Sequence, residues 1–499
     1  MHKTPPFSVS RVGCAIVLAL MSTTGIVTTK AQAAGANKAA ATPRVQSNNT
    51  TAPDTDLVRR IVRSLEQTNP NARGIGLPSP VTDADFRPLD PAQVELGKLL
   101  YHDKILSGNY NISCATCHNM LTDTSDGLSL PLGEGGQGLG PARENGFDDD
   151  AVHERVPRNA PHIFNLGAHE FTVMMHDGRI RVDPSKPSGF DTPADEDFMG
   201  GIDSVVSAQA CFPVTSFAEM AGQPGENNVA NSVFSNNLPR AWAILAKRVA
   251  LVPEYAQMFI EIYDDVQTNN DIRYHHIANA IGAYESAVGR ADNAPFDRFL
   301  RGDTGAMSMN AVNGMILFYG KAGCAECHSG KFQTDHSFRA IAMPQIGPGK
   351  GQNQPGYIDG LDDLGLGGET EIEEDNFKFR VPSLRNVALT GPWGHDGAYA
   401  TLDGVVRHHL DPVNALYNYD QSQAVLPDAG SLNTRDFLVM NTPERVDGIA
   451  AANELAPVNL TETEIDHLIE FLHALTDPDS IDIRHAIPMR VPSGLPVFD

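Results

Sequence analysis

The chain has 499 residues, of which 41% are hydrophobic and 20% charged, so it is long enough for two globular domains. Its formal net charge is −25 at pH 7. A surface this acidic argues against nucleic acid as a partner; it would attract a small basic redox protein, and it would equally serve solubility alone.

The first 33 residues have the pattern of a secretory signal peptide. Lys3 and Arg11 precede an apolar run at 12–27, and Ala31-Gln32-Ala33 makes a small-x-small cleavage site. The alternative is a retained membrane anchor, but the run is short for a span of about 20 apolar residues. We therefore expect export to the periplasm and a mature chain that is soluble after cleavage.

The rest of the chain predicts a mainly α fold with long irregular loops. Residues 34–54 are rich in Ala, Asn, Thr and Pro and predict a flexible leader. Strand signals are sparse, and Gly- and acid-rich stretches such as 347–376 predict surface loops. Helical periodicity predicts helices at 56–65, 91–101 (with Asp90 as N-cap), 238–249, 253–263, 272–288, 310–319, 402–410 and 461–475 (with Thr461 and Glu464 as a capping box).

Two C-x-x-C-H strings carry the chemistry. They are Cys114-Ala115-Thr116-Cys117-His118 and Cys324-Ala325-Glu326-Cys327-His328, and together they use four of the six cysteines. A reducing dithiol or half a zinc site would not need His after the second Cys both times. The strings predict two covalently attached c-type haems, with His118 and His328 as proximal ligands of the iron. Cys211 is then expected to be a small buried hydrophobe.

The sequence also repeats itself weakly. Each half has a haem motif and then an H-D-G string, at His176-Asp177-Gly178 and His395-Asp396-Gly397. The spacing from the motif His to the H-D-G string is 58 residues in one half and 67 in the other. We expect two similar c-type cytochrome domains, each around one haem, at 55–300 and 301–499.

The order of these motifs resembles the bacterial dihaem cytochrome c peroxidases and their MauG-type relatives. Residues 89–120 look like the opening of that family, and Gln209 and Glu219-Met220 look like its catalytic segment. The strings Phe379–Asn386 and His395-Asp396-Gly397 look like the core of its second domain. The resemblance covers about residues 85–410 and the final helix, and its motifs are specific in combination.

The resemblance implies a division of labour between the haems. The N-terminal haem would meet peroxide, and the C-terminal haem would receive electrons. Glu219 then matches the acid over the open face of the haem at His118, where a carboxylate can move a proton between the peroxide oxygens. Gln209 matches a pocket amide that could hydrogen-bond peroxide. Without the resemblance, Glu219 would be interpreted as a solvated surface acid.

One departure from the family pattern concerns the peroxidatic haem. Many of these peroxidases carry a loop His that plugs the iron until reduction. The matching position here is Glu134, which predicts no such plug, although His153, His162 and His169 lie nearby in the sequence and could substitute.

A second departure concerns the other haem, whose distal ligand is usually Met, or Tyr in MauG. Here the matching position is His409, fourteen residues after the His of the second H-D-G string. Neighbours on a helix lie about 100° apart, so only one of His408 and His409 can point at the iron. His409 is the match, His408 is the runner-up, and two surface histidines are the alternative. Ligation by two His lowers the potential relative to His and Met.

Further departures lie between and around the haems. The family's Trp between the haems is His176 here, while Trp393 stands near the equivalent place in the second repeat. Insertions are predicted at 181–203 and 412–456. The family also binds one Ca²⁺, for which the matching groups are the Asn159 side chain and the carbonyls of Thr390 and Pro392. The alternative is that Asn159 only caps a turn.

Three functions remain open on the sequence. The first is periplasmic reduction of hydrogen peroxide with electrons from a small redox protein, a cytochrome c or a cupredoxin. The second is MauG-like oxidation of side chains in a partner protein, which the missing plug and the non-Met ligand favour. The third is a dihaem electron-transfer cytochrome without enzymatic activity, against which Gln209 and Glu219 argue, because an electron carrier needs no acid in its pocket.

Overall fold

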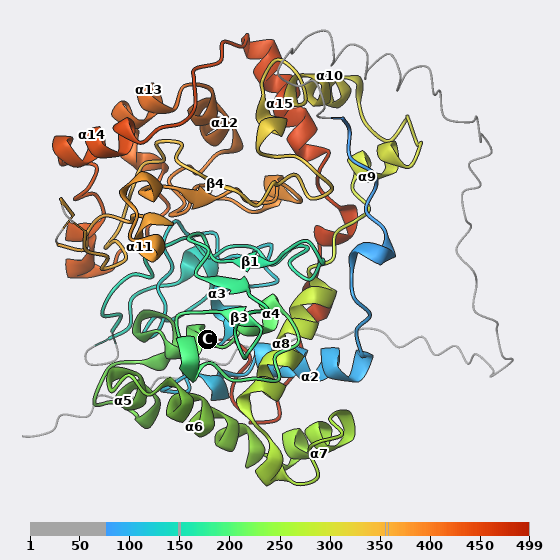
Figure 1. The fold of residues 1–499 in the computed structure, drawn as a ribbon, viewed down its shortest axis with the longest axis vertical. Helices are drawn as coiled ribbons and strands as arrows, with labels where there is room; N and C mark the ends of the chain where they lie inside the picture. Colours follow the sequence, from blue (N-terminus) through green and yellow to red (C-terminus); the bar gives the residue numbers. More distant parts are fainter. Residues whose placement is uncertain (1–75, 148–150, 355, 358, 499) are drawn as a thin grey trace, which may run out of the picture. The chain divides into compact units, whose positions relative to one another are not determined.

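A computed structural model of the chain describes residues 76–147, 151–354, 356–357 and 359–498. All of them belong to one compact unit. The predicted signal peptide, leader and helix at 56–65 lie outside the described residues. Helices predominate in the described chain and its strands are only two or three residues long, which confirms the mainly α prediction (Figure 1). No helix in this part of the chain is long and apolar enough to span a membrane.

The predicted helices form with small differences at their ends. Two of them, α2 and α12, begin and end where the sequence predicts. Asp90 caps α2, since its carboxylate accepts from Ala92 N at 2.9 Å, and Thr461 and Glu464 form the predicted capping box of α15. The helices are α2 (Pro91–Tyr101), α3 (Cys114–Cys117), α4 (Val205–Gln209), α5 (Asn228–Phe234), α6 (Leu238–Ala250), α7 (Pro253–Ile262), α8 (Tyr274–Val288), α9 (Pro295–Leu300), α10 (Met309–Phe318), α11 (Gly367–Thr370), α12 (Leu402–Leu410), α13 (Pro412–Tyr417), α14 (Pro443–Ala451) and α15 (Glu462–His473).

The strands form two small antiparallel sheets. β1 (Val173–Met174), β2 (Ile180–Val182) and β3 (Phe190–Asp191) pair in that order, with Val173 opposite Arg181. β4 (Phe338–Arg339) pairs with β5 (Phe379–Arg380), with Phe338 opposite Arg380. The two predicted insertions therefore contain regular structure: β3 and most of β2 lie in the first, and α13 and α14 lie in the second.

One loop prediction is wrong in part. The stretch 347–376 contains α11, and its residues Asp362, Asp363 and Leu364 are buried. A run of glycines and acids looks solvated when it stands alone. Asp363 is buried because Arg158, more than 200 residues earlier, donates to both of its carboxylate oxygens.

The same helix crossing occurs once in each half of the chain. Gly97 of α2 lies so close to α8 that a Cβ there would be 1.8 Å from the Ala280 carbonyl oxygen. Gly314 of α10 meets α15 in the same way, 1.8 Å from the His467 carbonyl oxygen. In both halves the first helix of the pair precedes a haem motif. Figure 1 shows α2 beside α8 and α10 beside α15. This helix crossing is therefore a feature that the two halves share, while the prediction of two haem domains stays a prediction.

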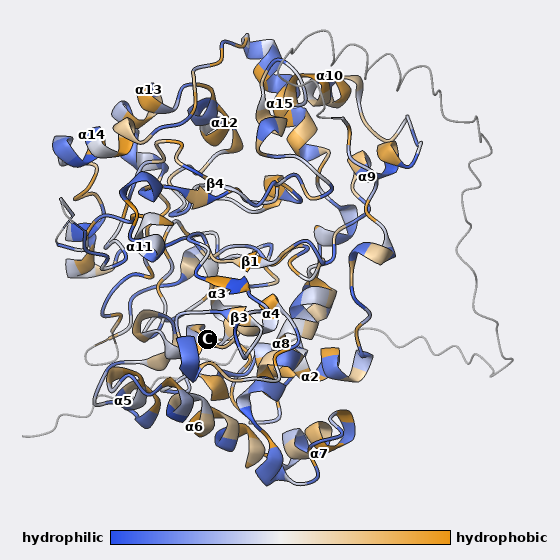
Figure 2. Ribbon diagram, viewed as in Figure 1, coloured by the Kyte–Doolittle hydropathy of each residue, from blue (hydrophilic) through white to orange (hydrophobic). Residues whose placement is uncertain are grey.

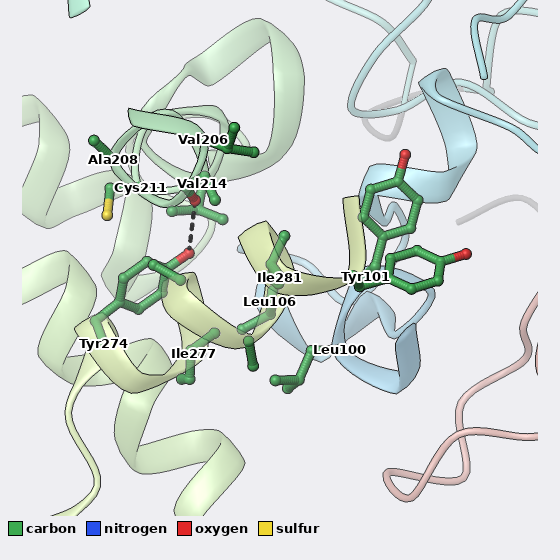
Figure 3. Packing of buried hydrophobic residues seen from close by; sticks show 14 of the residues in the cluster. Leu100, Tyr101, Leu106, Val206, Ala208, Cys211, Val214, Tyr274, Ile277 and Ile281 are labelled. Carbon is green, nitrogen blue, oxygen red and sulfur yellow. Dashed lines mark hydrogen bonds between the residues drawn. The ribbon is translucent and has the colours of Figure 1, made fainter. Parts of the chain in front are cut away.

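The described chain has two large hydrophobic cores, which correspond approximately to its two halves. The first gathers residues between 81 and 284, with Phe332, Ile483 and Ala486 added from later in the chain. Figure 3 shows part of it, where Leu100 and Leu106 approach Ile277 and Ile281 of α8. The second core gathers residues between 296 and 475. Helices such as α6 and α15 carry hydrophobic and hydrophilic residues along the same element (Figure 2). The domain boundary at 300 stays a prediction.

Candidate functional site

The first C-x-x-C-H string forms a single helical turn. Cys114 and Cys117 begin and end α3, and a spacing of three residues sets their thiols on one face. The His118 N–H donates to the Cys114 carbonyl at 2.9 Å, which continues the turn and places the imidazole directly after the thiols. Tyr101 of α2 donates its hydroxyl to the His118 carbonyl at 2.9 Å and ties the turn to the first core.

The second string forms a turn of the same kind. The Cys327 N–H donates to the Cys324 carbonyl at 3.3 Å and the His328 N–H donates to the same carbonyl at 2.9 Å. None of these four cysteines forms a disulfide, and all four are partly exposed. Each turn thus presents two thiols outside any disulfide and an adjacent imidazole, which is the donor set that covalent haem attachment needs. The residues present fit a haem at each string.

In the second half, the side chains of His328 and His409 lie close together. The ring centroids of His328 and His409 lie 6.3 Å apart, with an angle of 57° between the rings. A metal ion about 2 Å from a nitrogen of each ring would place the centroids about 6 Å apart. His328 Nδ1 bonds the carbonyls of Gln333 and Pro382, and His409 Nδ1 bonds the Val405 carbonyl at 2.8 Å. Such bonds leave Nε2 as the ligand atom.

Both ring nitrogens of the neighbouring His408 are already hydrogen-bonded, so neither is available to a metal. Its Nδ1 bonds the Tyr399 hydroxyl at 2.9 Å and its Nε2 bonds the Ile341 carbonyl at 2.8 Å. The side chain is fully buried, and burial lowers its pKa to about 3. Burial also lowers the pKa of His328 to about 4, with His409 acting in the same direction. The neutral imidazole that a metal requires is therefore the favoured form of His328.

The first half offers one histidine and a half-buried acid. Burial lowers the pKa of His118, while the backbone at Thr124 and Pro161 acts to raise it. Glu219 lies on a π-helical turn, Phe217–Ala221, after Ser216. Burial raises the pKa of Glu219, while Arg179, Lys350 and the Ser216 side chain act to lower it. A π-helical turn is rare and often marks a functional site.

Glu219 lies in the neighbourhood of the first haem motif. The charge of Glu219 raises the pKa of the Cys114 thiol, and so does the charge of Glu285, a residue of α8. Burial raises the pKa of Glu285 to about 8, so its carboxyl is mostly neutral at pH 7. Gln209 ends α4 and is partly buried, and its side chain makes no hydrogen bond within the described residues. The first motif therefore has an ionisable acid, a neutral acid and an unpaired amide in its half of the chain.

The loop that carries Glu134 is held by hydrogen bonds. Glu134 accepts from the side chains of Asn109 at 2.9 Å and Asn111 at 2.6 Å, and its N–H donates to the Ala218 carbonyl at 3.0 Å. Arg143 donates to the carbonyls of Leu132, Gly133 and Gly138. The loop is thereby fastened to the turn that carries Glu219. Of the histidines expected nearby, His153 and His169 are exposed, and His162 is half-buried and affected by His118.

A buried ionic cluster joins the halves. Arg158 donates to Asp177 at 2.6 Å and to Asp363 at 2.7 and 2.8 Å, and Arg179 donates to Asp177 at 3.0 Å. These cations hold the pKa of Asp177 and Asp363 well below its usual range, despite burial. The carboxylates are therefore ionised, and the cluster is fixed at neutral pH.

Two of the residues expected between the haems and at the calcium site, His176 and Asn159, lie close to His395 of the second half. Burial lowers the pKa of His176, and His395 lies close enough to act in the same direction. Trp393 donates its ring N–H to the Val387 carbonyl at 3.0 Å. The Asn159 N–H donates to the His395 carbonyl at 2.9 Å, and its Nδ2 donates to the Leu128 carbonyl at 2.8 Å. The calcium ligands, including Thr390 and Pro392, stay a prediction.

A second cluster of possible ligands does not suit a metal. Asp265, His275 and His276 place ligand atoms within 4.8 Å of one another. However, the Arg273 N–H donates to His276 Nδ1 at 3.0 Å, so Nε2 carries the proton and points it at Asp265 at 3.2 Å. That nitrogen has no lone pair for a metal, and the histidine instead caps α8.

The sequence interpretation missed three residues of this region. Arg158 and Glu285 were not selected, because a single Arg or Glu in a helical or loop segment has no distinguishing pattern. Arg380 stood inside the quoted string Phe379–Asn386 but received no role. The available signal was the rarity of an Arg in a segment whose neighbours, Val381 and Ser383, are buried.

Comparison with known proteins places the chain among related sequences. The family model described as di-haem cytochrome c peroxidase matches residues 91–305. The methylamine utilization protein MauG of Methylorubrum extorquens is 30% identical over 335 residues, which are 67% of this chain and 72% of that protein. A cytochrome-c peroxidase, IdrP1, of Denitromonas iodatirespirans is 27% identical and covers 80% of this chain and 85% of its own.

The fold is shared with solved structures. The crystal structure of a MauG-like protein associated with microbial copper homeostasis aligns with a TM-score of 0.53 and 23% identity. The alignment covers 83% of this chain and 98% of that one. At this identity the likeness concerns the fold alone.

Proposed function

The chain belongs to the dihaem cytochrome c peroxidase and MauG family, and from this premise we propose that it is a periplasmic peroxidase that reduces hydrogen peroxide to water. The electrons would come from a small redox protein, a cytochrome c or a cupredoxin. The acidic chain, with a net charge of −25, suits a basic partner of that kind.

The two haems would be held by the two motifs. Cys114 and Cys117 would attach one haem, with His118 on its iron. Cys324 and Cys327 would attach the other, between His328 and His409. When bound, the irons supply the redox chemistry, that is, peroxide binding at the first and electron entry at the second.

The difference between the two motifs carries the proposal. At the second, a histidine pair with centroids 6.3 Å apart leaves no room for a substrate on the metal. At the first, the acid Glu219 stands in the neighbourhood instead of a second histidine. Breaking the peroxide bond needs a proton moved from one oxygen to the other, and an ionised Glu219 can accept it and return it. The unpaired amide of Gln209 can donate to peroxide and orient it.

Steady-state turnover tests the proposal. The purified dihaem protein should oxidise a reduced cytochrome c or cupredoxin when peroxide is added, with two donor molecules consumed for each peroxide. No consumption of either donor by protein with full haem content would reject peroxidase activity with such donors.

Oxidation of side chains in a partner protein is the second candidate. Two observations favour it: Glu134 is tied to Asn109 and Asn111 rather than poised to cover an iron, and the second pair is His–His rather than His–Met. If peroxide reacts quickly but neither small donor sustains turnover, this candidate becomes the better one. If peroxide does not react at all, an electron-transfer role replaces both.

Calcium is part of the proposal as a structural ion. Its expected ligands, the Asn159 side chain and the carbonyls of Thr390 and Pro392, come from both halves. A chelator should therefore impair electron transfer between the haems. Unchanged spectra and activity in protein shown to be metal-free would reject the site.

A further inference from the structure

Arg380 is an exception among the enclosed arginines of this chain. Burial alone lowers the pKa of its guanidinium to about 10, and its Nη1 is buried without a hydrogen bond. Within the described residues it forms no ion pair with an acid. Of the four arginines that are buried in the described chain, three pair with acids: Arg155 with Asp436, Arg158 with Asp177 and Asp363, and Arg385 with Asp297; the fourth, Arg143, donates to three carbonyls.

The backbone and Nε of Arg380 are bound to the first half. Its N–H donates to the His176 carbonyl at 2.8 Å, and its Nε donates to the Met175 carbonyl at 3.2 Å. Met175 has a φ of 71°, in the left-handed region that L-residues rarely adopt. These two bonds hold the arginine in place. They leave its charge without an acidic partner on a side chain that is only partly exposed, which is unfavourable.

The position of Arg380 indicates which group would supply the missing anion. It stands opposite Phe338 across the β4–β5 pair, and Phe338 lies against Gly178 of the first half. Arg339, one residue along β4, instead acts on Cys327 of the second motif. The charge of Arg380 lowers the pKa of His162, and so does His118 of the first motif. Arg380 and His118 therefore both lie near His162, and Arg380 reaches that neighbourhood from a strand of the second half.

We propose that Arg380 binds a carboxylate of the haem attached at Cys114 and Cys117, so that a residue of the second half completes the first haem site. A haem carries two propionate carboxylates, and a guanidinium pairs with a carboxylate through parallel N–H donors. The inference rests on the haem attachment proposed above, but it does not depend on the peroxidase reaction.

The pairing has consequences for the potential of the first haem. A positive charge beside a haem stabilises the reduced form, which carries one more negative charge. Replacing Arg380 by Met keeps most of its bulk and removes the charge, so the first haem should become harder to reduce. We expect the equilibrium constant for reduction to fall by about tenfold, equivalent to about 59 mV for a one-electron couple.

Spectroelectrochemical titration of Arg380→Met, Arg380→Lys and Arg298→Met tests the proposal. Arg298 is a matched control, since it lies at the surface and pairs only with Asp303. Arg380→Met should lower the potential of the first haem and make it depend more strongly on pH, because the pKa of a carboxylate rises when its cation is removed. Arg380→Lys should restore most of the potential, and Arg298→Met should change nothing.

Three outcomes overturn the proposal. They are unchanged potentials in Arg380→Met with two haems attached, a shift confined to the haem between His328 and His409, and a lysine variant that behaves like the methionine variant. The last would mean that Arg380 only fastens the carbonyls of Met175 and His176. Mass spectrometry of the denatured protein keeps the inference separate from the haem assignment, because fewer than two attached haems in the wild type defeats that assignment first.

If the Arg380 variants do not accumulate as folded protein, the pairing can still be tested in protein that keeps Arg380. In protein that keeps Arg380 but carries Glu219→Gln and Glu285→Gln, a carboxylate paired with Arg380 stays ionised through the neutral range, so the potential of the first haem should not vary with pH there. A clear slope of that potential with pH would contradict the pairing.

Discussion

The two C-x-x-C-H turns are nearly the same, but their surroundings differ. In both, the histidine N–H donates to the carbonyl of the first cysteine at 2.9 Å, and a helix crossing at a glycine lies behind the turn. At the second turn, the ring centroid of His409 lies 6.3 Å from that of His328, and both rings bond backbone carbonyls through Nδ1. At the first, Glu219 occupies the neighbourhood and no described histidine is paired with His118 in this way.

Because the surroundings of the two turns differ, a repeated scaffold does not by itself determine the chemistry of its two copies. The turn determines where a haem can be attached. What lies opposite the histidine determines whether that haem can meet a substrate or can only pass electrons. In the proposed function, the π-helical turn at 217–221 and the helix α12 are the two elements that would make this distinction.

The largest effect should come from removing the acid of the first site. Glu219→Gln keeps the shape but cannot accept a proton, so reaction with peroxide should slow by about 10²–10⁴-fold. The pKa of Glu285 is raised to about 8, so it is already mostly neutral at pH 7 and Glu285→Gln should change the rate little. Stopped-flow mixing with peroxide measures both. Equal rates for wild type and Glu219→Gln would contradict a catalytic role for Glu219, and with it the proposed difference between the two sites.

A second change tests whether the two halves stand independently. Arg158→Met leaves Asp363 buried without its cation, and breaking a buried pair in this way costs about 3–5 kcal/mol. The surface variant Arg298→Met should cost about 0–1 kcal/mol. Denaturant unfolding measures both. A cost for Arg158→Met no larger than for Arg298→Met would mean that the cluster does not hold the halves together.

The buried ionic cluster of Arg158, Asp177 and Asp363 also predicts how the stability of the fold changes with pH. The pKa of Asp363 is depressed in the folded state, so its contribution to stability is present above the unfolded pKa of about 3.9 and is lost as pH falls below it. In Arg158→Met that pKa is no longer depressed, so the fall in stability at acid pH should be shallower than in the wild type.

The histidine pair of the second site allows a sharper comparison on one helix. His409→Ala should abolish the low-spin spectrum of the second haem, and His409→Met should raise its potential. His408→Ala should leave that spectrum intact but reduce stability by about 1–3 kcal/mol, because it strands the Tyr399 hydroxyl and the Ile341 carbonyl. The reverse pattern would exchange the roles of the two histidines.

The smallest expected effect concerns the charge beside Glu219. Lys350, from the second half, acts with Arg179 to lower the pKa of Glu219. Lys350→Met should therefore raise that pKa, and the acid limb of the pH–rate profile for peroxide should move to higher pH. Lys350→Arg should keep the wild-type profile, and Lys321→Met, at the surface with Glu464, serves as the control. A profile that moves to lower pH contradicts the assignment of that limb to Glu219.

Much of this could be predicted from the sequence because it depends on near neighbours in the chain. Asp90 and Thr461 cap their helices through residues two or three positions away, and the ends of α2 follow from Asp90 and the Pro that comes after it. Each haem turn is likewise a local structure, since its thiols and imidazole lie within five residues. Cys211, expected to be a small buried hydrophobe, is fully buried.

The remaining features depend on residues that meet only after folding. Periodicity does not reveal the burial of Asp363, because its partner Arg158 is 205 residues away. It does not choose between His408 and His409 either, because that choice rests on Tyr399 and Ile341 occupying both nitrogens of His408. The uncompensated charge of Arg380 could not be anticipated, since charge balance is a property of everything that packs around a group. The sequence alone therefore determined where haems can attach, and the tertiary structure decided which charges and nitrogens remain available to them.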